Sequence, residues 1–430
     1  MKLIFDVSDK PKAGQLVVFA LQQMLAILAA TIAVPLIIGN GLTPAAAMFG
    51  AGVGTIVYIL FTKRKSPVFL GSSFAFLGSM AAAFAGGVSM QLGMLGLIVG
   101  AFLAGLVYVV IAIVVKFVGV GWLNKLMPAV VIGPTVAIIG LSLAGNAIGD
   151  LVKGDVTKQV TEYAVSTDSG TPEIIETVSN VPVGSSYVAL ICGLITLAVV
   201  MLCSTYGKKT LRLIPFIIGI LVGYAAAAIF TVIGNICDID ALKIVDFSVF
   251  SSYMLTDGSV SLKTFVSLPD FAFVSGLKGL KEFDFTYFAT IFVAYVPVAL
   301  VVFAEHVADH KNLSSIIDHD LLEEPGLTRT LLGDGVGSIA GALFGGCPNT
   351  TYGESVACVA ITGNASVVTI FAAAIGCMLF SFITPLVAFV DSIPACVMGG
   401  VCIALYGFIA VSGLKMIQDA NLDDNRNLFV

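Results

Sequence analysis

The chain has 430 residues, of which 58% are hydrophobic and only 11% are charged. In ordinary soluble domains about a quarter of the residues are charged, so this composition excludes such a protein. It predicts helices that span a lipid bilayer. The net charge of −6, without any block of basic residues, gives no indication of nucleic-acid binding.

Twelve apolar stretches predict membrane spans, and two of them are short and interrupted. In the first half we expect spans at 15–39, 45–62, 69–84 (short), 91–118, 123–147, 185–204 and 211–234. In the second half we expect them at 284–308, 328–346, 349–362 (short), 366–390 and 394–414. The mixed, charged first 14 residues and the long first span predict no cleaved signal peptide.

The two halves of the sequence resemble each other. MPAVVIGP (127–134) is similar to IPACVMGG (393–400), and the short spans FLGSSFAFLGS (69–79) and CPNTTYGESV (347–356) stand in corresponding places. Seven spans precede the midpoint, so the second half must enter the membrane from the opposite side. Interrupted spans at matching positions of two inverted halves indicate the binding site of a transporter.

Basic residues in the short loops indicate how the chain is oriented. If every span crosses the membrane once, the KRK run at 63–65 lies on the same side of the membrane as the N-terminus. The other Lys and Arg residues of short loops lie on that side as well. Because cytoplasmic loops are enriched in positive residues, we expect a multi-pass protein of the plasma (inner) membrane with a cytoplasmic N-terminus.

The stretch CPNTTYGES (347–355) interrupts the second short span with a proline, polar side chains and one carboxylate. A helix broken inside the bilayer exposes N–H donors at its N-terminal end, while Glu354 adds acceptor oxygens. This combination would suit an imide, and GSSF (71–74), which contains Ser73, would supply the facing half-helix. The alternative is a packing kink at Pro348 with Glu354 facing loop water.

The stretch FAEHVADH (303–310) closes the eighth predicted span. Glu305 and Asp309 are four residues apart and share a helix face, and His306 and His310 share a neighbouring one. Two buried carboxylates close together cannot both ionise easily, so the pair favours holding a proton. We expect His310 to meet water at the end of the helix.

The same stretch also permits a zinc hypothesis. HVADH (306–310) is close to the HxxEH zinc pattern, and His319 is the remaining histidine of the chain. However, Asp309 replaces the glutamate that would act as the general base, and zinc explains neither the repeat nor the broken spans. We therefore predict no metal site, no cofactor and no enzymatic activity.

Four motifs together resemble the nucleobase-ascorbate transporter family, and within it the bacterial uracil:proton symporters, from about residue 9 to the end. They are GSSFAF (71–76), AEHV (304–307), DLLEEPGL (320–327) and PNTTYGE (348–354). The resemblance implies an all-α polytopic membrane protein with fourteen spans in two inverted repeats of seven. Spans 1–4 and 8–11 would form a core domain, and spans 5–7 and 12–14 a gate domain.

The resemblance also implies the residues of the binding site. Glu305 and Glu354 would bind a nucleobase through their carboxylates. Backbone N–H groups at Phe74 and Gly353 would meet the carbonyl oxygens of the base, and Tyr352 would line the pocket.

Several positions depart from the family pattern. Gln23 stands where the family commonly has a histidine, and Asp309 where uracil carriers have one. Ser355 and Ala357 replace an asparagine and a glycine of the family signature. The sequence ends at 423–430, where a thirteenth span should begin, so we expect the last two spans to be absent from it.

These considerations predict the following organisation. The segments are 15–147 with spans 1–5 (core spans 1–4, gate span 5), 148–184 as an extracytoplasmic loop, 185–234 with gate spans 6–7, 235–283 as an extracytoplasmic segment between the repeats, 284–390 with core spans 8–11, and 394–430 as the start of the second gate part.

We expect an importer of uracil driven by protons, in which the core moves like an elevator against the gate. Glu305, with Asp309 and His306, would couple the proton, and the partners would be uracil, protons and the lipid bilayer; a homodimer is compatible with this expectation. One alternative is a xanthine or urate carrier of the same family, which should have Gln in place of Glu354. Another is an anion carrier of the related fold with two inverted repeats of seven spans, which should lack Glu305 and Glu354.

Overall fold

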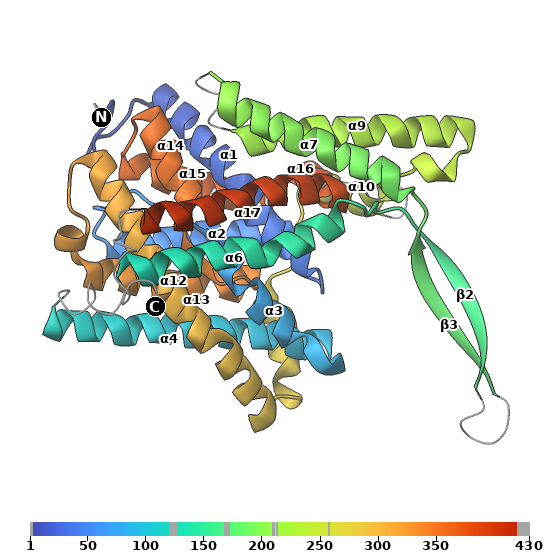
Figure 1. Cartoon of the computed structure of the whole chain (residues 1–430), viewed down its shortest axis with the longest axis horizontal. Coiled ribbons are helices and arrows are strands. Elements are labelled where there is room, and N and C mark those ends of the chain that lie inside the picture. The colour runs from blue at the N-terminus through green and yellow to red at the C-terminus, as the bar shows by residue number, and fades with distance from the viewer. Residues whose placement is uncertain are drawn as a thin grey trace.

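The computed structural model describes residues 3–119, 128–166, 173–208, 211, 214–256 and 259–418, and its frame is a bundle of long helices (Figure 1). The helices of the first half are α1 (Ala13–Ile38), α2 (Pro44–Phe61), α3 (Leu77–Ala83), α4 (Met90–Val118), α6 (Ala129–Asp150), α7 (Ser186–Tyr206) and α9 (Pro215–Cys237). Those that follow are α10 (Ser248–Met254), α11 (Ala272–Gly276), α12 (Phe285–Ile317), α13 (Leu327–Gly345), α14 (Gly353–Thr362), α15 (Val367–Phe380), α16 (Thr384–Asp391) and α17 (Ala395–Ile417).

Three antiparallel strand pairs accompany the helices. They are β1 (Leu70–Ser72) with β6 (Asn349–Thr351), β2 (Thr157–Ser166) with β3 (Glu173–Pro182), and β4 (Leu255–Thr256) with β5 (Ser259–Val260). The β2–β3 hairpin projects away from the helices in Figure 1. By length and composition, seven of the described helices can cross a membrane, and three further apolar helical stretches are shorter. The chain is therefore a multi-pass membrane protein, as its composition predicts.

Each of the two interrupted spans contains a short strand followed by a short helix. Leu70 lies opposite Thr351, and Ser72 lies opposite Asn349, so the two segments cross each other in antiparallel directions. All six strand residues are buried, and the pair is contacted by α1, α2, α12 and α13. The predicted pairing of two broken spans from inverted halves is confirmed, and the strands are an addition that the sequence did not reveal.

Hydroxyl groups on neighbouring elements satisfy the backbone of the buried strand pair. Leu70 donates its N–H to the Thr55 hydroxyl (2.9 Å), and the same hydroxyl donates to the Leu70 carbonyl (3.2 Å). The Asn349 N–H donates to the Ser338 hydroxyl (2.9 Å). Because lipid offers no hydrogen bonds, irregular backbone inside a helix bundle persists only where such partners are supplied.

Glycines allow the helices around the strand pair to approach closely. A Cβ on Gly50 of α2 would lie 2.4 Å from the Gly341 carbonyl oxygen of α13, and a Cβ on Gly54 would lie 2.8 Å from the Gly337 oxygen. The pair α6 and α17 shows the same feature, because a Cβ on Gly413 would lie 2.5 Å from the Gly133 oxygen. Small residues at four-residue spacing are the usual basis of close helix contacts in membranes.

A carboxylate outside the spans connects the segments at 148–184 and 235–283 with α17. The Asp155 carboxylate accepts a hydrogen bond from the Ala395 N–H at the start of α17 (3.1 Å). The Asp155 N–H donates to the Ile244 carbonyl (3.0 Å). Burial raises the pKa of Asp155 to about 6, because desolvation disfavours the charged carboxylate.

Two predicted boundaries are wrong. The span expected at 284–308 continues as α12 to Ile317. The span expected at 366–390 is two helices, α15 and α16, because Pro385 in the first turn of α16 cannot continue a preceding helix. Residues 123–127 of the fifth predicted span and residues 419–430 lie outside the described part of the chain.

We predict that Gly50→Ala destabilises the bundle by about 1–3 kcal/mol, the usual cost of overpacking a close contact. The new methyl group would have to push α2 away from the Gly341 backbone, which cannot rotate aside. The measurement is thermal unfolding of the purified protein in detergent. Gly407→Ala in α17 is the matched control, because a Cβ there meets nothing within 4 Å. Equal melting temperatures for the two variants would contradict the prediction.

Candidate functional site

The two half-helices begin inside the bundle without side-chain caps. β1 leads into the short 3₁₀ helix η1 (Phe74–Phe76) and then into α3, while β6 leads directly into α14. Neither Ser73 before η1 nor Tyr352 before α14 makes a side-chain cap hydrogen bond. The first N–H groups of a helix have no acceptor within the helix. The N–H groups of Phe74 and Gly353 are therefore donors that a bound molecule could use.

Tyr352 connects the two broken spans. Its hydroxyl donates to the Ser72 carbonyl of β1 (2.7 Å), and its ring lies so close to Gly71 that a Cβ there would come within 2.2 Å of it. Gly71 is thus required by the close approach of the ring. The hydroxyl is already engaged, so Tyr352 offers a fixed aromatic wall rather than a free hydrogen-bonding group.

Three carboxylates gather beside the start of α14. Glu305 and Asp309 lie one turn apart on α12, and Glu354 is the second residue of α14. Asp309 accepts a hydrogen bond from the Thr351 hydroxyl (2.9 Å), and its other oxygen lies 4.0 Å from where a Cβ on Gly353 would be. Glu305 is close enough to Asp309 and Glu354 to interact with them electrostatically.

These three carboxylates share two properties. Each of them is half-buried, and none forms an ion pair with the described residues, whose ion pairs join other groups. A partly accessible cluster of acidic groups without cations suits a neutral molecule that donates hydrogen bonds, and it suits protons. It does not suit an anion, which the cluster would repel.

Ser73 and Phe74 stand at the other end of the strand pair. The Ser73 hydroxyl is buried and has no hydrogen-bond partner among the described residues, so it is a further group available to a ligand. The Phe74 ring meets the Tyr406 ring of α17 edge to face, with 5.6 Å between the centroids. This aromatic contact joins the half-helix to a helix of the opposite side of the bundle.

His306 is directed away from the carboxylate cluster. It is fully buried, and its Nδ1 lies 2.6 Å from Asp334 Oδ2 on α13 while its Nε2 lies 3.0 Å from the Thr330 hydroxyl. The structure thus brings Glu305, Asp309 and Glu354 together and places His306 between α12 and α13. The structure shows Asp334 of α13 as the buried partner of His306, a pairing that the sequence did not indicate.

The expectation that His310 meets water is wrong. α12 continues past it to Ile317, and the imidazole is fully buried, with Nε2 2.6 Å from the Tyr58 hydroxyl. His319 lies elsewhere, at the exposed connection to α13, where it contacts Glu324. His306 and His310 lie against each other, with 4.0 Å between their ring centroids, but His319 does not join them. The described residues contain no group of three or more His, Cys, Asp or Glu that could hold a metal.

Two departures from the family pattern contact each other, and the sequence did not reveal their pairing. The Gln23 side-chain amide of α1 donates to the Ser355 hydroxyl of α14, and both side chains are buried. The same hydroxyl accepts from the Phe69 N–H, just before β1 (3.0 Å). The only signal for this link in the sequence was that both positions deviate from the motif together.

Two cavities reach the broken spans from opposite ends. One of about 730 Å³ lies between the end of α1 and α3 on one side and α6 on the other, and Phe74 is part of its wall. The other, of about 240 Å³, lies between α1 and α14 on one side and α7, α9 and α17 on the other, and Glu354 is part of its wall. The broken spans therefore separate two spaces, each of which contacts one half-helix start.

Both cavities follow a seam between two groups of helices. α13 packs extensively on α2 and α4, and α17 packs extensively on α6 and α7. The contacts of α1 with α9 and α17, and those of α12 with α6, are much sparser. The half-helix starts lie along this seam.

We predict that Ser355→Ala lowers the free energy of unfolding by about 1–3 kcal/mol, the usual cost of leaving buried groups without partners. The change removes the hydroxyl that the Gln23 amide and the Phe69 N–H both use. Thermal unfolding in detergent measures the effect. Ser381→Ala is the control, because within the described part of the chain that hydroxyl bonds only to the Met378 carbonyl three residues earlier. A Ser355→Ala variant as stable as the control would refute the link.

Comparison with known proteins places this geometry in a family. A model described as the Permease family matches residues 14–430. The chain is 36% identical over 433 residues to a uracil permease of Bacillus caldolyticus, covering 100% of this chain and 86% of the relative. It is 32% identical over 420 residues to a uracil permease of Escherichia coli (strain K12), covering 98% and 83%.

A solved structure confirms the fold. The transmembrane domain of a cyanobacterium bicarbonate transporter, BicA, matches with a TM-score of 0.65 at 13% identity, covering 99% of this chain and 95% of that one. At this identity the likeness establishes the inverted-repeat fold alone. The relatives that match along the chain are permeases, which are transporters and not enzymes. The chain belongs to the permease family, as its resemblance to nucleobase transporters predicts.

Proposed function

We propose that the protein imports uracil together with protons across the plasma (inner) membrane, with its N-terminus in the cytoplasm. The observation that carries this proposal is the cluster of Glu305, Asp309 and Glu354 beside the uncapped start of a half-helix. Relatives that cover nearly the whole chain are named uracil permeases, which supports uracil as the substrate.

The hydrogen-bonding groups of the site match those of uracil. Glu305 and Glu354 would accept hydrogen bonds from the two ring N–H groups, and the N–H groups of Phe74 and Gly353 would donate to the two carbonyl oxygens. The Ser73 hydroxyl has no other partner among the described residues and can serve a carbonyl oxygen as well. The Tyr352 ring would provide an apolar wall beside the base.

The same carboxylates support proton coupling. Three acidic groups without a cation repel one another, and a proton on one of them relieves that repulsion. Glu305 and Asp309 lie one turn apart on α12, so Glu305 would exchange the proton, with Asp309 as the neighbouring acceptor. His306 would act indirectly, through its bond to Asp334 on the far side of α12.

The seam between the helix groups supports alternating access by an elevator movement. α1–α4 and α12–α16 would form the core, which carries both broken spans, and α6, α7, α9 and α17 would form the gate. Because the two cavities lie along the sparse contact between these groups, sliding the core against the gate would open the site first to one side and then to the other. A homodimer would brace the gate groups during this movement.

We predict that Glu354→Gln lowers the affinity for uracil by about 10- to 100-fold while the protein stays folded. The amide would present an N–H to a ring N–H, and a buried donor facing a donor costs about 1–3 kcal/mol. Calorimetric titration of the purified protein with uracil, and with xanthine and bicarbonate as competitors, is the measurement. Glu323→Gln, at an exposed position, is the control. If Glu354→Gln binds uracil with wild-type affinity, Glu354 does not belong to the site. If the wild type binds xanthine more tightly than uracil, the substrate is a purine and not uracil.

We predict that Glu305→Gln abolishes accumulation of uracil driven by a proton gradient. The amide cannot release and rebind a proton, although its oxygen can still accept one hydrogen bond, so some binding should remain. Uptake into proteoliposomes with and without an imposed gradient tests this prediction. A variant that still concentrates uracil only when the gradient is applied would show that Asp309 or another group couples the proton.

A further inference from the structure

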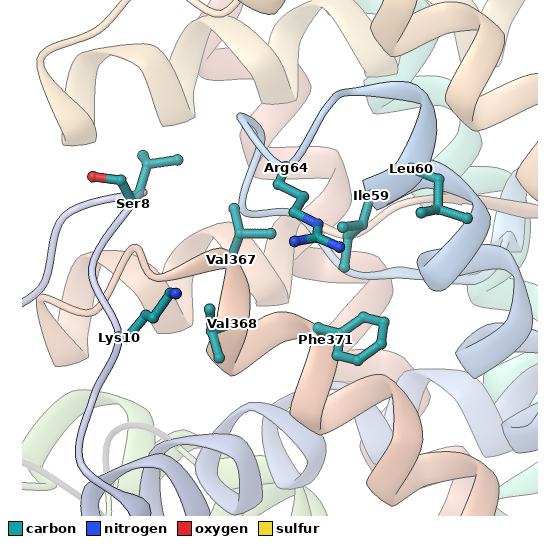
Figure 2. Close-up of a pocket in the computed structure, with 9 residues that line it drawn as sticks. Ser8, Lys10, Ile59, Leu60, Arg64, Val367, Val368 and Phe371 are labelled. Carbon is teal, nitrogen blue, oxygen red and sulfur yellow. The ribbon is translucent and has the colours of Figure 1, made fainter.

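A further pocket lies near the N-terminal segment, outside the seam. It is a pocket of about 410 Å³ between the N-terminal segment, the end of α2 and the start of α15. Lys10 and Arg64 line it from opposite sides, and Figure 2 shows both charged ends directed toward Val367 and Val368 between them. Ser8 also lines the pocket, with its hydroxyl directed away from the two cations in Figure 2.

Backbone hydrogen bonds hold the segments that carry the two cations. The N-terminal segment is bound to the connection between α14 and α15 by the Ile4 N–H to the Gly363 carbonyl (2.7 Å) and the Ala365 N–H to the Phe5 carbonyl (2.9 Å). The Arg64 N–H donates to the Ile59 carbonyl (2.9 Å) in a left-handed turn that ends α2. The pocket is therefore built from fixed segments and not from a loose tail.

Neither cation has an ion-pair partner among the described residues. Lys65, next to Arg64, is paired with Glu324. The nearby carboxylate of Asp6 accepts a hydrogen bond from the Val7 N–H, and that of Asp9 accepts one from the Asp6 N–H. The two positive charges at the pocket are thus left for a ligand, and a phosphate group matches both by charge and by hydrogen-bond geometry.

The rest of the pocket is apolar and continues onto the outer surface of the bundle. Leu60 is 60% exposed and Phe371 is 39% exposed, and both line the pocket. Ile375 and Leu379 follow Phe371 at four-residue spacing on α15 and are 39% and 61% exposed. In a membrane protein these exposed apolar side chains face lipid, so an apolar track runs from the two cations along α15.

From this arrangement we propose that the pocket binds an anionic phospholipid of the leaflet on the N-terminal side. Lys10 and Arg64 hold the phosphate, and the acyl chains lie on Leu60, Val368 and Phe371 and along α15. A phosphate compound without chains would leave the apolar track unused, and a neutral lipid would leave the two cations uncompensated. Basic pockets between spans at a membrane surface are the expected form of an anionic lipid site.

The test is native mass spectrometry of the full chain in detergent, titrated with phosphatidylglycerol and with phosphatidylcholine of the same acyl chains. Each cation at a membrane surface strengthens attraction to an anionic lipid by about fivefold, so the wild type should prefer phosphatidylglycerol by about 25-fold. Lys10→Gln combined with Arg64→Gln should abolish most of that preference. Lys12→Gln combined with Lys63→Gln removes the same charge from exposed neighbours outside the pocket and should retain it.

Two further experiments distinguish binding through the phosphate from binding through the acyl chains. Glycerol phosphate, which has the charge but no chains, should not displace bound phosphatidylglycerol. Phe371→Gln should weaken both lipids and leave their ratio unchanged. Equal losses in the two double variants, displacement by glycerol phosphate, or unaltered lipid binding in Phe371→Gln would each overturn the proposal. Circular dichroism and size-exclusion chromatography confirm that every variant is folded.

Discussion

The antiparallel pairing of β1 with β6 is the constraint on which the rest of the structure depends. Two spans are interrupted inside the bundle, where water cannot satisfy their backbone groups. The two strands form backbone hydrogen bonds with each other. The hydroxyls of Thr55, Ser338 and Ser355 accept hydrogen bonds from further backbone N–H groups in and beside the strands. Only because this pair is stable can two half-helices begin inside the bundle with free N–H donors and a carboxylate beside them.

The glycine contacts serve the same constraint. α2 and α13 approach so closely at Gly50, Gly54, Gly337 and Gly341 that their backbones touch, and both helices contact the strand pair. This rigid packing keeps the carboxylates of α12 and α14 in fixed positions relative to the strands. The second close pair, α6 with α17, is built in the same way on the other side of the seam. Two rigid groups with sparse contact between them are suited to a sliding movement, whereas a uniformly packed bundle would resist it.

The chain uses its buried polar groups in two different ways. Around the strand pair they are structural, as in the Gln23–Ser355 contact and the His306–Asp334 pair, whose side chains bond to each other inside the bundle. At the seam, Glu305, Asp309 and Glu354 retain accessible surface and form no ion pair with a described residue. Buried ionisable groups in membranes are costly and are usually retained for function. Accessibility, more than charge, therefore distinguishes the groups that can meet a substrate from those that hold the bundle together.

The sequence by itself determined the membrane class, the repeat, the two broken spans and the residues beside them. These features are local: apolar length, motif similarity and the position of a proline or a carboxylate can all be found along the chain. The identity of the cluster also followed, because Glu305 and Asp309 share a helix face and Glu354 follows a break.

Only the tertiary structure decided which polar groups face which space. His306 lies four residues before His310 and next to Glu305, yet its ring is directed to Asp334 on another helix. Gln23 and Ser355 are 332 residues apart and still in contact. The strands β1 and β6 have three residues each, too short for any periodic pattern, and they form only because each supplies the other's partners. Such features depend on packing between distant segments, which no local pattern encodes.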